Sequence, residues 1–357
     1  MHRLILITSV ALAMTCGSSL NAQTSESLVG QRILTRYRSV PLYQGNMIVG
    51  NSSQLVFPLT VRSVQGDWLE VWDNYIRSIT WIHRSHVCTI NEAIPYFSSR
   101  ISSTPYDDHL YFMRSEAYRE LGQDAEALQD VNMLVQLRPT ARSRNIRANQ
   151  LRQMGRYDEA LAEYNWALAI QPGYYLALLG RGRIWVKLEK WDLALSDFNQ
   201  AIAFNPNYVN TYFDRARVWK VKHEYARAIS DFEQALRLDP NSTRALDSLA
   251  WMKATCPEPS FRNGIDAVRL ANSACEKTQW GNSYFIESLA AAYGESGKID
   301  DALAKLQKAT EVGPTLSIER RRLMRLSFEA GHAYQEDTAQ EPMPSPESPR
   351  PYAPPAT

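Results

Sequence analysis

Gly173 to Pro206 reads GYYLALLGRGRIWVKLEKWDLALSDFNQAIAFNP, and Asn207 to Pro240 reads NYVNTYFDRARVWKVKHEYARAISDFEQALRLDP. Both stretches have the same length, end on proline and place an Ala-x-x-x-Phe pattern twelve positions before that proline. Self-similarity at a fixed period of this size predicts stacked copies of one structural unit. The fold is therefore decided by what one copy forms and by how far the period extends.

The period extends over most of the chain. Prolines recur at a nearly constant interval at Pro105, Pro139, Pro172, Pro206 and Pro240, and Pro314 follows after two such intervals and a short insertion. An alanine lies twelve positions before each of the later prolines, at Ala127, Ala160, Ala194, Ala228 and Ala302. Apolar or small residues four and seven positions after each alanine share one face of a helix. A second stripe earlier in each copy, such as Gly182 and Trp185, predicts a preceding helix, so each copy is a helical hairpin ended by proline.

A helical hairpin of about 34 residues with these small, aromatic and proline positions resembles the tetratricopeptide repeat. The resemblance covers 106–314, about six hairpins, and implies a mainly α fold: a tetratricopeptide-repeat α-solenoid. Unit five departs from the pattern, because an insertion beginning Thr255-Cys256-Pro257 separates helices expected at 242–254 and 265–276. The run from Leu249 to Pro257 looks like the ending of certain bacterial exported repeat proteins. An amphipathic stretch within 315–334 is expected to form a helix that caps the last apolar face.

Four arginines and four acids recur in register. Each acid follows its arginine at the same distance along the chain, in the pairs Arg114 and Asp130, Arg147 and Glu163, Arg181 and Asp197, and Arg215 and Asp231. Units five and six lose both members together, with Leu249 and Leu270, and then Leu289 and Lys305, in their places. This joint loss predicts structural ion pairs between the two helices of a unit rather than a ligand site.

The N-terminal block, 27–90, has a different period. Apolar residues alternate in 59–64, 66–72 and 79–82, and Gly66-Asp67 is a turn signal, so short strands are expected. The order Val61-x-x-Val64-x-Gly66-Asp67-Trp68-Leu69-x-Val71, followed by Trp81-Ile82, resembles a bacterial Src-homology-3-like β-barrel. Trp68, Trp72 and Trp81 are candidates for an aromatic ligand groove, although at least one is expected in the core.

A half-repeat helix at 91–105 is expected to join the barrel to the solenoid. Ala93, Phe97 and Pro105 match the second helix of a unit. Pro95 is unfavourable inside a helix, at a cost of about 3 kcal/mol, so the helix is expected to start near Ile94 or to kink.

The two chain ends indicate processing and flexibility. Residues 1–22 place His2-Arg3 before an apolar run too short to span a membrane and end in Ala22, which predicts a signal peptide and export to the periplasm or cell envelope. Acylation at Cys16 is the less favoured alternative. The tail, 335–357, holds seven prolines and is expected to be disordered; its PxxP forms are interpreted as solubilising rather than docking motifs.

Charge and motif content argue against an enzyme. The chain has 39 basic and 38 acidic residues, which excludes a generally basic nucleic-acid binder. It contains no phosphate loop and no defensible catalytic constellation, so we expect no catalysis, no cofactor, no metal and no membrane span. His83, His86 and Cys88 are only a loose metal-like group, since on a strand His83 takes the opposite face. Cys88, Cys256 and Cys275 do not form a disulfide framework.

The resemblance implies a peptide-binding concave face lined by the first helices of the units. Register places ten residues there: Arg142, Asn145, Asn149, Arg152, Arg183, Lys187, Asn210, Phe213, Arg217 and Lys220. Asparagines and guanidinium groups suit an extended acidic segment or a free C-terminus, and these arginines lack the repeating acid partner of the other set. The leading hypothesis is a non-catalytic exported scaffold for protein or peptide binding, with the barrel as a second interaction module. The alternative is a cell-envelope glycan (peptidoglycan) binder that acts through the barrel, with the solenoid as spacer.

Overall fold

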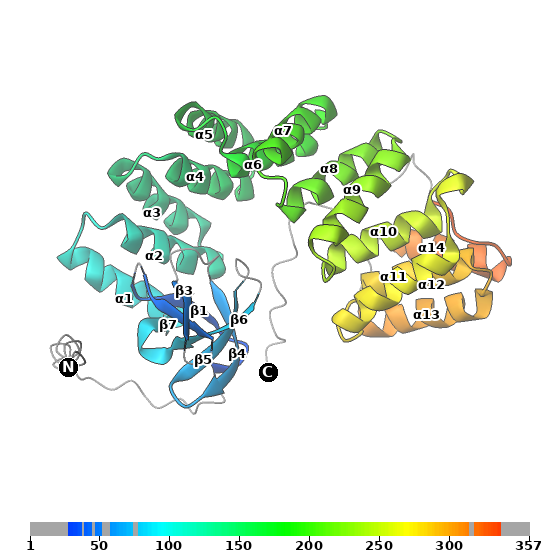
Figure 1. Cartoon of the computed structure of the whole chain (residues 1–357), viewed down its shortest axis with the longest axis horizontal. Helices are drawn as coiled ribbons and strands as arrows, with labels where there is room; N and C mark the ends of the chain where they lie inside the picture. The colour runs from blue at the N-terminus through cyan, green and yellow to red at the C-terminus, as the bar shows by residue number, and fades with distance from the viewer. Residues whose placement is uncertain are drawn as a thin grey trace, which may run out of the picture. The chain divides into compact units, whose positions relative to one another are not determined.

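The structure is a computed structural model that describes residues 28–336, except 38, 45–46, 52–57, 74–77 and 314–317 (Figure 1). The predicted signal peptide, Pro314 and the tail from residue 337 lie outside the described residues. The chain divides into two compact units, 1–139 and 140–357, which are described separately.

The first unit begins with an antiparallel sheet. The described residues form seven strands in the order β3-β2-β6-β5-β4-β1-β7. Their bounds are β1 Arg32–Thr35, β2 Pro41–Gln44, β3 Met47–Asn51, β4 Leu59–Gln65, β5 Trp68–Asp73, β6 Ser78–His83 and β7 Val87–Thr89. Gly66, with φ of +59°, supplies the predicted turn between β4 and β5. Alternate residues such as Leu69, Val71 and Ile82 are fully buried in one core cluster, as the period of two requires.

The described part of this unit continues after the sheet with the helices α1 Ile90–Ser103, α2 Asp108–Glu120 and α3 Asp124–Leu137. The expected start of α1 near Ile94 is wrong, because the helix begins at Ile90 and contains Pro95. Thr89 and Glu92 form a capping box that fixes the earlier start. Phe97 packs in one cluster with Leu34 of the sheet and Met113 of α2, so α1 joins the sheet to the first hairpin.

The second unit consists of helical hairpins. The helices are α4 Ala141–Gln153, α5 Tyr157–Ile170, α6 Tyr175–Lys187, α7 Trp191–Phe204, α8 Val209–Val221, α9 Tyr225–Leu238, α10 Thr243–Thr255, α11 Gly264–Lys277, α12 Ser283–Glu295, α13 Ile299–Val312 and α14 Ile318–Glu329. The unit-five insertion holds a short 3-10 turn, η4, at Pro259–Phe261. Met324 and Phe328 of α14 are buried against the last hairpin, as expected of a capping helix.

Small residues allow the helices to approach closely. A Cβ added to Gly182 of α6 would lie 2.5 Å from a ring carbon of Phe198 in α7. The repeat alanines Ala160, Ala194 and Ala228 are fully buried. The stripe of small and aromatic residues in the sequence is therefore the packing surface of each hairpin.

The four in-register ion pairs are confirmed. In three units the arginine Nη2 lies 2.6 or 2.7 Å from its aspartate, in the pairs Arg114–Asp130, Arg181–Asp197 and Arg215–Asp231. Arg147 pairs with Glu163, which also accepts from Arg144 at 3.2 Å. These residues hold helices together and are not available as a ligand site.

Candidate functional site

The ten predicted groove residues all lie on first helices. Arg142, Asn145, Asn149 and Arg152 are on α4, Arg183 and Lys187 are on α6, and Asn210, Phe213, Arg217 and Lys220 are on α8. We call these positions the groove face. The groove face also includes the residues of α10 that lie one repeat period after those of α8. The repeat brings them to equivalent places on successive helices, but their local environments differ.

Three arginines on successive first helices interact with one buried carboxylate. Asp214 of α8 is 3% exposed, and its Oδ2 accepts from Nε of Arg183 in α6 at 2.7 Å. Arg217 of α8 and Arg244 of α10 lie close enough to interact electrostatically with Asp214 and Arg183. We call Arg183, Arg217 and Arg244 the arginine cluster. The expectation that the groove arginines have no acid partner is wrong for Arg183, because Asp214 lies outside the regular spacing of the four structural pairs.

The positive charges of the arginine cluster influence one another. Burial lowers the pKa of the Arg217 and Arg244 guanidinium groups below the usual value for arginine. The neighbouring arginines lower the pKa further, whereas Asp214 acts in the opposite direction. For Arg183, burial also lowers the pKa, but Asp214 outweighs it and the pKa is raised. Arg244 lies over the Phe213 ring, 4.2 Å from its centroid. Three cations gathered around Asp214 in a poorly hydrated place favour a further carboxylate.

Several other predicted residues have structural partners. Asn149 Oδ1 accepts from the hydroxyl of Tyr164 in α5 at 2.7 Å, so this asparagine joins the helices of its own hairpin. Burial raises the pKa of Tyr164, while Arg152 and Arg183 act in the opposite direction. Asn145 is buried, whereas Arg142 and Lys187 are exposed. The Oδ1 of Asn149 is thus engaged within its own hairpin.

Two members of this site, Asp214 and Arg244, are not among the ten residues predicted from the sequence. Arg244 stands one repeat period after Asn210, so extending the register into unit five would have found it. Asp214 has glycine, Gly180, at the equivalent position one unit earlier. Because it occurs once, no periodic signal marks it.

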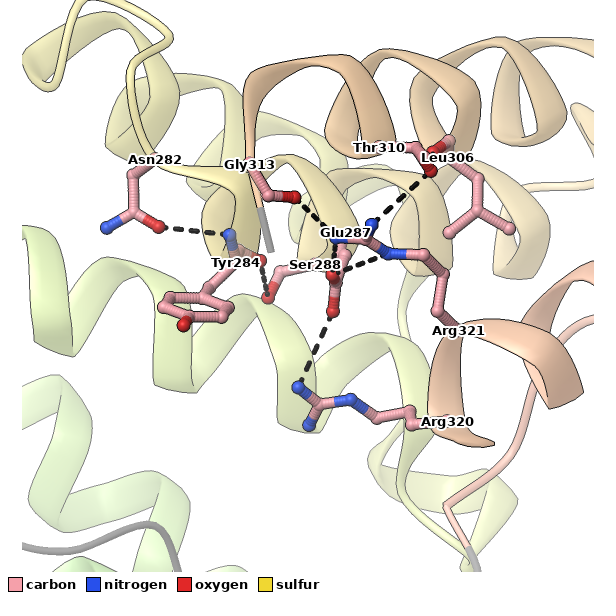
Figure 2. A network of polar contacts seen from close by, with 9 residues as sticks. All are labelled: Asn282, Tyr284, Glu287, Ser288, Leu306, Thr310, Gly313, Arg320 and Arg321. Carbon is pink, nitrogen blue, oxygen red and sulfur yellow. Dashed lines mark hydrogen bonds and ion pairs between the residues drawn. The ribbon is translucent and has the colours of Figure 1, made fainter. Parts of the chain in front are cut away.

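A second charged cluster joins α10, α12 and α14. Glu287 of α12 is 1% exposed and accepts from Nε of Arg321 in α14 at 2.9 Å, and Arg320 lies 3.5 Å away on its other side (Figure 2). Asp247 of α10 belongs to the same cluster, since Ser288, Arg320, Glu287 and Lys220 all influence its carboxyl. Burial raises the pKa of Asp247 to about 7. The capping helix is thus held by buried charges as well as by apolar packing.

Trp68 and Trp81 lie on the face of the sheet that points away from the core. Trp68 is half-buried and packs edge-on against Tyr43 at 5.0 Å and against His83 at 5.1 Å between ring centroids. Trp81 is half-buried opposite Tyr43 in the strand pairing. The side chain of Trp72 lies outside the described residues. Trp68 and Trp81 therefore differ from the fully buried Leu69 and Ile82 beside them.

The histidine and cysteine group differs from its expected geometry. A 3-10 turn, η3 at Arg84–His86, interrupts the strand, and the rings of His83 and His86 lie 5.8 Å apart. Cys88 is buried in β7 and points its thiol to the carbonyl of Leu34. The expectation that His83 and Cys88 lie on opposite faces of one strand is therefore wrong. Within residues 28–336 as described, no group of three or more potential metal ligands assembles.

Cys256 and Cys275 are buried and unpaired in the structure. Among the described helices, none is long and apolar enough to cross a bilayer.

Comparison with known proteins identifies the repeats. Residues 147–209 and 209–242 match family models of the tetratricopeptide repeat. The chain is similar in structure to the APC/C hetero-tetramer Cut9-Hcn1, with a TM-score of 0.54 and 16% identity over 64% of this chain and 44% of that one. This likeness concerns the fold alone. No curated protein matches the chain in sequence.

Two further solved structures have lower scores. A tetratricopeptide repeat protein from Parabacteroides merdae ATCC 43184 has a TM-score of 0.48 and 20% identity over 62% of this chain and 86% of its own. YrrB, described as a tetratricopeptide repeat protein with an unusual peptide-binding site, has a TM-score of 0.43 and 21% identity over 52% of this chain and 93% of its own. The predicted fold class is confirmed: a mainly helical, tetratricopeptide-repeat-like solenoid is preceded by a small antiparallel sheet.

Proposed function

We propose that the chain is a non-catalytic scaffold that binds a protein or peptide through the groove face of its repeats. The observation that carries this proposal is the arginine cluster, in which Arg183 pairs with the carboxylate of Asp214 and the guanidinium groups of Arg217 and Arg244 interact with it electrostatically. An acidic segment or a free C-terminus would add a second anion to this cluster, and a planar carboxylate suits the forked geometry of arginine. Solenoids present such sites on extended surfaces.

A displayed random-peptide library tests this proposal. The wild-type chain should enrich peptides rich in aspartate and glutamate, and Arg217→Gln/Arg244→Gln should lose that enrichment. Arg183 is left unchanged because its removal would strand the buried Asp214. The matched control is Arg237→Gln/Arg269→Gln, which removes the same charge from exposed positions on the second helices α9 and α11. Equal enrichment by the cluster variant would contradict the site.

The enriched peptides also distinguish the two ligand forms. C-terminally amidated copies should bind as well as free acids if side-chain carboxylates are recognised. They should bind at least about tenfold more weakly if the arginine cluster takes the terminal carboxylate, which corresponds to about 1.4 kcal/mol. Measuring both copies by fluorescence polarisation assigns the class of partner.

A specific observation favours a second function for the sheet. Tyr43, Trp68 and His83 of the sheet and His86 of η3 form a continuous row of edge-on ring contacts at 5.0–5.8 Å. Aromatic rows suit stacking on sugar rings or on apolar peptide side chains. Co-sedimentation of the full chain with purified peptidoglycan should be lost in Trp68→Ala and retained in Trp166→Ala, which alters an exposed tryptophan of α5. Retention by both variants would remove the glycan hypothesis for this face.

We propose that this work is done outside the cytoplasm, in the periplasm or cell envelope. The support is the pattern of residues 1–22 described above. Mass spectrometry of the chain purified from a bacterial host should find a mature N-terminus at Gln23. A lipid-modified Cys16 at the new N-terminus would favour the alternative, and an intact Met1 would contradict export.

A further inference from the structure

The end of the described chain lies along first helices of its own repeats. After α14 the backbone turns at Gly331, where φ is +78°, and the amide of His332 donates to the carbonyl of Ser327. Further along, the amide of Glu336 donates to the carbonyl of Thr255 in α10 at 3.0 Å. The carboxylate of Glu336 reaches Lys220 of α8 at 2.7 Å. Residues 332–336 thus run from α14 past α10 to α8.

The side chains that receive this segment belong to the groove face. Lys220 is one of the ten predicted groove residues, and Trp251 stands one repeat period after Arg217, at the same position of the next first helix. The ring of Tyr334 lies 6.1 Å from that of Trp251, and both are buried in one core cluster. The guanidinium carbon of Arg320 also lies over the Trp251 ring, 4.8 Å from its centroid. The segment therefore occupies positions where the repeat pattern predicts a bound peptide.

The contacts alternate along the segment as they would in a bound extended peptide. Tyr334 is 7% exposed and Glu336 is 9% exposed, whereas Gln335 between them faces solvent. An extended backbone presents alternate side chains to one side, so two of the three point at the helices. The Tyr334 ring contacts Trp251. The Glu336 amide donates to the Thr255 carbonyl, and the Glu336 carboxylate accepts from Lys220. The groove face therefore contacts an aromatic side chain and, two positions later, an acidic side chain.

We propose that Tyr334–Glu336 is a built-in occupant of the groove face over α8 and α10, and that this subsite binds external peptides of aromatic-x-acidic sequence in competition with it. The inference rests on the proposed function, since it assumes that the groove face takes peptides. It adds the sequence class of the partner and a form of regulation. A covalently attached occupant acts at an effective concentration in the range of about 1 mM, so it competes with any partner present at lower concentration.

Competition makes a measurable prediction for the full chain. The released variant is Tyr334→Ala/Glu336→Gln, and its matched control is Gln335→Ala, which changes the solvent-facing residue between them. The probe is a fluorescent hexapeptide of residues 331–336, amidated at its C-terminus so that Glu336 supplies its carboxylate. By fluorescence polarisation the released variant should bind the probe at least tenfold more tightly than wild type or Gln335→Ala.

Three further arms separate a binding site from a loosened fold. A probe with alanine in place of its tyrosine should not bind the released variant. Lys220→Glu in the released chain should abolish binding of the unaltered probe, whereas Lys222→Glu, which changes a lysine paired with Asp192, should not. Glu336→Lys, which leaves the buried Tyr334 in place, should give a smaller release than the double variant. Circular dichroism melting should report folded chains throughout.

Equal probe binding by the released and wild-type chains, or no binding to the released chain, would overturn the inference. If the peptide library nevertheless enriches acidic peptides through Arg217 and Arg244, the proposed function stands and only the built-in occupant is lost. If the probe binds as expected while the library yields nothing, the subsite over α8 and α10 stands and the arginine cluster is not a binding site.

Discussion

Arg215 donates two hydrogen bonds to Asp231, from Nε to Oδ2 at 2.8 Å and from Nη2 to Oδ1 at 2.7 Å. Its remaining nitrogen, Nη1, donates to Asn199 Oδ1 of the preceding second helix at 2.7 Å. One side chain therefore connects three helices: its own, the second helix of its unit and the second helix of the unit before. Arg181 makes the same set of contacts one repeat earlier.

The fifth unit suggests how this pair can be replaced. Leu249 and Leu270 occupy the two positions there, and both are buried in one core cluster. We expect Arg215→Leu or Asp231→Leu alone to destabilise the fold by about 2–4 kcal/mol, because each leaves a partly buried charge without its partner. The double variant should cost less than about 1 kcal/mol, since apolar packing replaces the pair. Urea denaturation gives all three values, and a double variant as costly as the sum of the singles would refute the coupling.

The sequence predicted these four pairs because arginine and acid recur at a constant separation and disappear together. The pairing of Arg183 with Asp214 could not be predicted in this way, since it crosses from α6 to α8 and occurs once. Glu287 is equally irregular: its partners lie on α14, outside the hairpins. Periodicity shows what every unit shares, whereas the candidate site is built from what one unit does differently.

The start of α1 and the path of residues 332–336 also escaped prediction. The penalty of Pro95 argued for a later start, but the capping box at Thr89 and a buried Phe97 outweigh it. Residues 332–334 fell at the end of the range assigned to the capping helix, and residues from 335 were assigned to the tail because of the prolines that follow. Tyr334 and Glu336 are single residues without period, and only their partners Trp251 and Lys220 explain their burial.

Gly182 should not tolerate a methyl group. The added Cβ would meet the fully buried ring of Phe198 at 2.5 Å, and neither helix can shift without disturbing its neighbours. We expect Gly182→Ala to lower the free energy of unfolding by about 1–3 kcal/mol. Gly313→Ala is the matched control, because the nearest atom there is 3.9 Å away and the backbone is extended. A partial recovery in Gly182→Ala/Phe198→Leu would locate the cost in this contact, while equal effects of the two alanine variants would contradict it.

Cys88 and Cys275 should be inert in the native chain. Burial raises the pKa of each thiol to about 12, so almost no thiolate is present at neutral pH. In a Cys16→Ser background, labelling of both by Ellman's reagent should be at least about a hundredfold slower than that of an introduced Ser260→Cys on the exposed η4 turn. Urea should make all thiols react equally. Rapid native labelling at Cys88 or Cys275, located by mass spectrometry, would show that these helices or strands open readily.

Asp247 should make the stability of the chain depend on pH. Burial raises the pKa of its carboxyl from 3.8 to about 7, while a hydrogen bond with Ser288 and the charges of Arg320 and Lys220 only partly oppose this. Between these two values the unfolded chain releases a proton that the folded chain keeps, so the folded state loses stability as pH rises from about 4 to 7. A pKa difference of this size sets an upper limit of about 4 kcal/mol for the loss of stability.

Asp247→Asn removes the titration. Relative to wild type, we expect the variant to gain stability on going from pH 5 to pH 8, by about 1–3 kcal/mol in urea denaturation. The pKa of Glu116, also raised to about 7 by burial, contributes equally to both chains and cancels in the difference. Asp192→Asn, at an exposed aspartate, is the control and should follow wild type at both pH values. A difference between Asp247→Asn and wild type that is the same at pH 5 and pH 8 would mean that this carboxyl is already ionised in the folded chain at pH 5, held by Arg320 and Lys220 despite its burial.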